Sequence, residues 1–122
     1  MGKSEELVEK LNWLKKDAAN TVTAMAASML YTTFDNELIH EERDGYLKLL
    51  DMARRLQLVN ISEIETIFNI LNDINMTCNT LIHYAVNTTD YEPMAIKLSI
   101  LSGYIKAIRN RSRELQEKLK IQ

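Results

Sequence analysis

The strongest structural signal in the chain is MAIKLSILSGYIKAIRNRSRELQEKL, residues 94–119. Its apolar residues recur at alternating steps of four and three, which keeps one face of a long helix against its neighbours. Between residues 94 and 108, Ile100, Tyr104 and Ala107 widen this stripe, as a helix packed in a bundle requires. The pattern predicts a helix over residues 91–120. The stripe consists of Met94, Leu98, Leu101, Ile105, Ile108, Ser112, Leu115 and Leu119.

Three earlier segments also show helical spacing, and we expect helices over residues 4–33, 36–57 and 62–86. Ser4 and Asp35 are suitable N-caps for the first two. Ser62 and Glu65 have the spacing of a capping box for the third, whose Asn75 we expect on its hydrated side. Four helices joined by short connections predict an all-α, antiparallel four-helix bundle with long first and last helices, formed as a single domain by residues 1–122.

Composition excludes several other classes of protein. The 122 residues carry a net charge of −2, so nucleic-acid binding is unlikely on charge alone. The single cysteine excludes an internal disulfide framework, and Cys78 lies on an apolar stripe, where we expect a core thiol. No apolar run is long enough for a membrane span or a secretory signal. We therefore expect a cytoplasmic protein without membrane contact or cofactor.

The lengths of the predicted helices suggest self-association. The first and last helices, at roughly 30 residues, would span about 45 Å, which exceeds the two middle helices. The overhanging ends then need cover, and a second copy of the chain supplies it in a homo-oligomer. The predicted interface residues lie on the last helix: Leu101, Ile108, Leu115 and Leu119.

A non-enzymatic interaction or regulatory role explains these features best. In this interpretation the protein self-associates and binds a partner protein through its helical surface, as an adaptor or inhibitor. An alternative is an oligomer that sequesters an anionic, nucleotide-like molecule. Basic residues on one side of the last helix would hold that small-molecule ligand: Lys106, Arg109 and Arg113.

A second alternative is an enzyme that uses His40. Glu37 and His40 have the Glu-x-x-His spacing of ferritin-like metal sites, and His83 would lie opposite them on the next helix, so these three residues are a candidate metal site. The run His40-Glu41-Glu42-Arg43 also resembles the phosphoaccepting helix of histidine-kinase dimerisation domains, which implies phosphotransfer by His40. Asp44-Gly45 stands where that family usually has proline. Glu42 falls close to the apolar stripe, and we expect it at the edge of that stripe.

Overall fold

A computed structural model describes residues 2–35, 42–89 and 92–121 of the protein. The helices are α1 (Lys3–Asp35), α2 (Arg43–Leu58), α3 (Ile64–Tyr84) and α4 (Glu92–Ile121), and a π-helical turn, η2 (Ala85–Thr89), extends α3. These described ranges contain no β-strand. The prediction of an all-helical protein is therefore confirmed for them.

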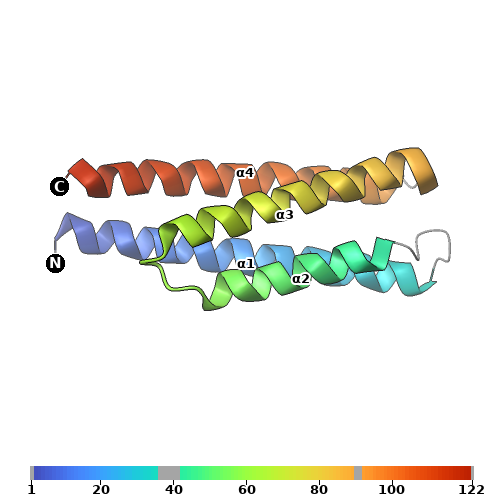
Figure 1. The fold of residues 1–122 in the computed structure, drawn as a ribbon, viewed down its shortest axis with the longest axis horizontal. Helices are drawn as coiled ribbons and strands as arrows, with labels where there is room; N and C mark the ends of the chain where they lie inside the picture. Colours follow the sequence, from blue (N-terminus) through green and yellow to red (C-terminus); the bar gives the residue numbers. More distant parts are fainter. Residues whose placement is uncertain (1, 36–41, 90–91, 122) are drawn as a thin grey trace.

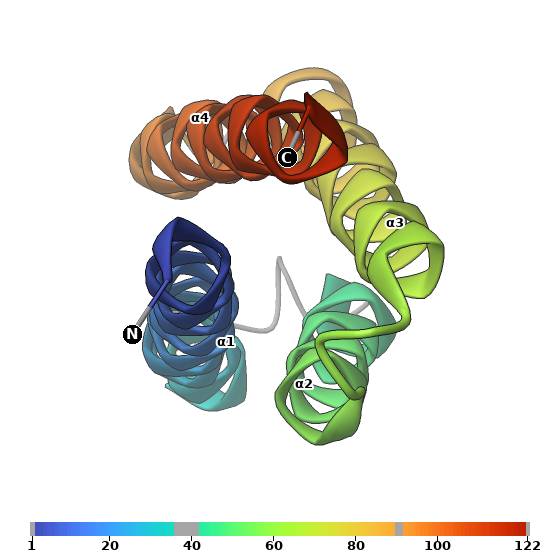
Figure 2. The same ribbon diagram turned by 90° about the vertical axis from the view of Figure 1, so that its left-hand side faces the viewer.

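The four helices lie lengthwise beside one another. Successive helices run in opposite directions along the long axis, and both termini lie at the same end of the molecule (Figure 1). Seen along that axis, the helices surround a shared interior (Figure 2). Because α1 packs on both α2 and α4, and α3 packs on the same two helices, the first and last segments of the chain become neighbours.

All four predicted helix starts differ from the structure, the second and third by more than one residue. The second helix was expected from residue 36; α2 begins at Arg43, and residues 36–41 lie outside the described residues. The capping box at Ser62 is wrong, because the N-cap of α3 is Glu63. The backbone N–H of Ser62 instead donates to Oδ1 of Asn60 at 2.9 Å. The Asn60 side chain thus organises a turn before the helix starts.

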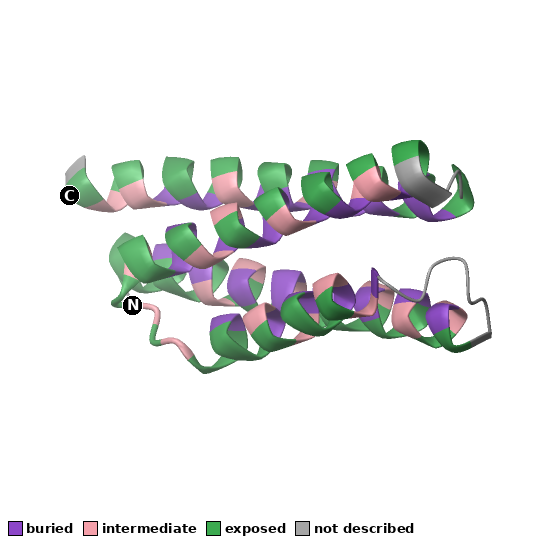
Figure 3. Ribbon diagram, turned by 45° about the vertical axis from the view of Figure 1, so that its right-hand side comes forward, coloured by how far each residue is buried: buried purple, intermediate pink, exposed green. Residues whose placement is uncertain are grey.

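The core is lined by the inward faces of all four helices (Figure 3). On α1 these are mostly small residues such as Ala18, Val22 and Ala26, which let the neighbouring helices approach closely. Larger side chains from the other helices, including Leu71 and Leu98, fill the space between them. The heptad stripe of α4 is therefore the core stripe that its spacing predicts.

The predicted interface residues on α4 lie inside this single chain. Leu101, Ile108 and Leu115 are buried, and Leu119 is partly buried. Leu115 packs in a separate cluster with Leu7 and Leu11 of α1. The expected overhang is present, because α1 has 33 residues and α4 has 30, against 16 in α2 and 21 in α3, but the two long helices pack against each other. Leu101, Ile108 and Leu115 therefore offer no open surface to a second copy.

Buried polar contacts fix the alignment of neighbouring helices. Nζ of Lys15 donates to the carbonyls of Leu56 at 3.2 Å and Gln57 at 2.8 Å, so a cation satisfies the last turn of α2. Burial, and then the charge of Lys16, lower the pKa of Lys15.

Between α3 and α4, the buried Ser102 hydroxyl donates to Oδ1 of Asn75 at 2.6 Å. Asn75 was expected on the hydrated side of its helix, and that expectation is wrong because the residue is buried. A buried polar pair tolerates no slip of one helix along the other, since slipping would leave both groups unsatisfied. This bond therefore sets the register of α3 against α4.

Candidate functional site

The side of α4 that faces away from the core carries an unbroken apolar row. Ile96, Ile100, Gly103 and Ala107 recur at steps of four, three and four, and all four are exposed. We call these four residues the outer face of α4. Ile96 is 53% exposed and Ile100 is 63% exposed, which is high for isoleucine. Ile100 and Ala107 were expected to widen the buried stripe, and their exposure contradicts that expectation.

Gly103 lies in the middle of this outer face. A glycine inside a helix costs about 1 kcal/mol relative to alanine, so it needs a reason. Close packing within the chain is not that reason, because a Cβ atom at Gly103 would meet no atom within 4 Å. The outer face thus has a flat centre that the fold itself does not use.

The two flanks of the outer face are tied to neighbouring helices. On the α1 side, the hydroxyl of Tyr104 donates to the Asp17 carboxylate, and burial followed by this bond raises the pKa of Tyr104. On the α3 side, Nη1 of Arg109 donates to Oδ1 of Asn72 at 2.8 Å. These contacts fix the rotation of α4 about its axis, and so fix which residues face outward.

The predicted anion-binding residues lie mainly on the α3 flank. Arg109 bonds to Asn72, and the guanidinium of Arg113 lies 5.3 Å from the centre of the Phe68 ring. Lys106 is exposed. The structure therefore engages two of the three cations with α3.

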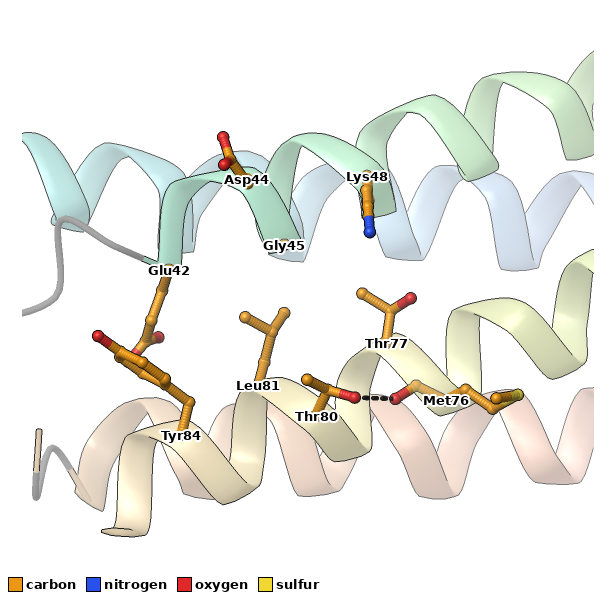
Figure 4. A pocket seen from close by; sticks show the side chains of 9 residues that line it. All are labelled: Glu42, Asp44, Gly45, Lys48, Met76, Thr77, Thr80, Leu81 and Tyr84. Carbon is orange, nitrogen blue, oxygen red and sulfur yellow. Dashed lines mark hydrogen bonds between the residues drawn. The ribbon is translucent and has the colours of Figure 1, made fainter. Parts of the chain in front are cut away.

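A second feature is a hollow of about 360 Å³ between α2 and α3 (Figure 4). Glu42 lines it at the start of α2, and Tyr84 reaches the same end of the hollow from α3 (Figure 4). Glu42 is only 2% exposed, so its expected position at the edge of the stripe is wrong. The hydroxyl of Tyr46, one turn later, donates to Oε2 of Glu42 at 2.5 Å. Burial, and then this bond, raise the pKa of Tyr46.

This contact explains how the fold accommodates a buried carboxylate. The spacing Glu42-x-x-x-Tyr46 places the two side chains on one helix face, one turn apart. The expected edge position overlooked the Tyr46 hydroxyl, although its i, i+4 spacing from Glu42 is visible in the sequence. Gly45 lies beside this pair, where α2 comes close to Leu81 of α3.

Comparison with protein-family models, curated proteins and solved structures finds no match to this chain. A function therefore has to be argued from the chemistry and the exposure of its own residues.

The candidate metal site is only partly covered by the described residues. Glu37 and His40 lie outside them. His83 is exposed, and the side-chain amide of Asn87 lies 3.0 Å from its Nδ1. Among the described residues, no group of three or more His, Cys, Asp or Glu side chains is arranged to hold a metal ion. Within that same part of the chain, no helix combines the length and the apolar character of a membrane span.

Proposed function

We propose that the protein is a non-enzymatic interaction protein that binds a helix of another protein chain through the outer face of α4. The observation that carries the proposal is the exposed pair Ile96 and Ile100 beside Gly103, a helical glycine with open space around its Cβ position. Small residues beside larger apolar ones let a second helix approach closely, and burial of the isoleucines supplies the binding free energy.

The proposal includes an architecture for the chain. We infer a single-domain, antiparallel four-helix bundle in which α1 and α4 form the long pair. In this arrangement the bonds of Tyr104 and Arg109 to neighbouring helices hold the outer face in a fixed orientation. A pre-ordered binding face loses little conformational entropy when a partner docks. An adaptor or inhibitor role fits such a rigid platform.

Photo-crosslinking tests the proposal in cells of the native host. A benzophenone amino acid replaces Ile96 on the outer face, and a matched control replaces the exposed Asn69 on α3. We expect the probe at position 96 to give one discrete adduct and the probe at position 69 to give none.

Two leucine variants make the test specific. Gly103→Leu fills the flat centre of the outer face, where an added Cβ meets no atom within 4 Å, so it should abolish the adduct while circular dichroism stays unchanged. Asn69→Leu adds a similar side chain elsewhere and should leave the adduct intact. Absence of any adduct at position 96, or an adduct that survives Gly103→Leu, would contradict the proposal.

A further inference from the structure

The order of side chains along the outer face of α4 has a two-fold pattern. The bulky residues Ile96 and Ile100 come first, and the small residues Gly103 and Ala107 follow. The two pairs are placed symmetrically about the point midway between residues 100 and 103. A second α4 that runs antiparallel about this point would bring Ile100 opposite Gly103 and Ile96 opposite Ala107.

We propose that the occupant of the outer face is a second copy of this chain, docked antiparallel through α4. This inference rests on the proposed function and names the partner. In the antiparallel pair each isoleucine fills the space left by a small residue, twice over by symmetry. A parallel pair would set isoleucine against isoleucine and glycine against glycine, which leaves both crowding and a gap.

The charges near the ends of α4 favour the same arrangement. Glu92 stands at the start of the helix, and Arg111 stands ten residues before its end. The antiparallel pairing places Glu92 of one copy at the same level as Arg111 of the other. The Arg111 side chain is exposed, and its guanidinium also pairs with Glu114 of its own helix at 3.1 Å. A parallel pairing would instead bring the two Glu92 carboxylates together.

Four apolar residues per copy form a small interface, which corresponds to weak and reversible association. Most of the contact therefore comes from Ile96, Ile100 and Gly103. The flanking charges select the antiparallel direction of the two helices.

Cysteine pairing distinguishes the two directions. Ile96→Cys and Ala107→Cys are made as separate proteins and oxidised alone or as an equimolar mixture. In the antiparallel pair, residue 96 faces residue 107 of the other copy, whereas identical positions are eleven residues apart, about 16 Å along the axis. A disulfide requires Cα atoms within about 7 Å. The native Cys78 is buried and remains in place in every sample.

We expect the mixture to form a disulfide-linked heterodimer at least tenfold faster than either variant forms a homodimer. Asn69→Cys, mixed with each variant, is the control and should give no specific product. Faster linkage within a single variant would show a parallel pair and overturn the inference. Equal slow linkage in all samples, together with a monomer mass by sedimentation, would also overturn it.

The two proposals fail in different ways. If the adduct formed in cells at position 96 has the mass of two copies of this chain, both stand. If that adduct contains a different protein and the purified chain sediments as a monomer, the binding face stands and the second-copy inference is wrong.

Discussion

At the scale of single residues, the Glu42–Tyr46 contact is the most informative feature of the molecule. A buried carboxylate costs several kcal/mol unless hydrogen bonds compensate for the water it loses. Tyr46, itself fully buried, supplies one such bond at 2.5 Å. The pair lies at the start of α2, next to the hollow between α2 and α3. The strength of the hydrogen bond between Tyr46 and Glu42 therefore affects how α2 begins and how α2 packs against α3.

Removal of the tyrosine hydroxyl should be costly. We expect Tyr46→Phe to lower the free energy of unfolding by about 2 kcal/mol, because a hydrogen bond to a charged group is lost inside the protein. Glu42→Gln should cost less, since its amide oxygen still accepts the hydroxyl and no charge is buried. Urea unfolding of both variants and of the double variant measures the coupling. A loss no larger than the ~0.5 kcal/mol of a surface substitution in Tyr46→Phe would contradict this assignment.

Because the Cys78 thiol is buried, we expect the free energy of unfolding to depend on pH in the alkaline range. Burial raises the pKa of Cys78 from an ordinary 9.0 to about 12. Above pH 9 the unfolded chain loses this proton and the folded chain keeps it, so the free energy of unfolding falls as pH rises. We expect Cys78 to contribute a slope of about 1.4 kcal/mol per pH unit in that range.

Cys78→Ala isolates this contribution. Urea unfolding under reducing conditions should show a shallower alkaline decline in the variant than in the wild type. Tyr46 and Tyr104, whose pKa values are also raised, contribute with the same sign to both proteins. Parallel declines in the two proteins would show that the thiol ionises with equal ease in the folded and unfolded states.

At the scale of helices, sequence spacing correctly predicts burial for residues that belong to a long repeating stripe. It does not predict burial for a residue whose position depends on a single hydrogen-bond partner. The stripe from Met94 to Leu115 is buried as its heptad spacing predicts, because many apolar residues at this spacing lie on the same face of the helix. Asn75 was assigned to the wrong side, since its burial depends on a single bond to Ser102. Ile100 was placed in the core, since spacing cannot tell how wide a stripe the neighbouring helices will cover.

The same limit applies to the candidate site. The outer face of α4 becomes visible only when the structure shows which isoleucines stay exposed. The predicted cationic set was recognisable in sequence, but the Asn72 and Phe68 contacts that engage Arg109 and Arg113 lie on another helix. Partners some 40 residues away in the chain are set by how the helices pack, and no local pattern encodes them.

The two glycines within α2 and α4 provide a matched test of packing. Alanine at either position gains helix propensity. At Gly45 the new Cβ would lie 2.4 Å from Cδ2 of Leu81, whereas at Gly103 it meets open space. We expect Gly103→Ala to stabilise the monomer by about 1 kcal/mol. Gly45→Ala should be less stable than Gly103→Ala by about 1–3 kcal/mol, the usual cost of overpacking.

Thermal or urea unfolding at a concentration that keeps the protein monomeric gives both values. Equal effects of the two substitutions would show that Leu81 yields to the new methyl group by moving into the adjoining hollow. The outcome for Gly103 also bears on function, because a glycine that weakens its own helix is retained most simply for an external contact.

At the scale of the whole molecule, α1 and α4 are longer than α2 and α3, and this difference in length divides the hydrophobic core into two clusters. The main cluster involves all four helices, while Leu7, Leu11 and Leu115 form a smaller cluster at the end where the termini lie. Among the described residues, Ile61 and Ile64, from the α2–α3 connection and the start of α3, are the hydrophobic residues from the middle of the chain that pack against this smaller cluster. Fewer buried contacts per residue hold this end together, so it should open independently of the rest.

Hydrogen exchange followed by mass spectrometry would detect this local opening. We expect amides in residues 5–12 and 113–120 to exchange through openings of lower free energy than amides in residues 67–78 and 98–105. Leu11→Ala removes a buried side chain from the small cluster and should accelerate exchange mainly in the first two segments. Leu71→Ala, in the main cluster, should lower protection throughout, by an amount that matches its loss of about 2–5 kcal/mol in global stability. Uniform acceleration by Leu11→Ala would instead show that the two clusters unfold as one cooperative unit.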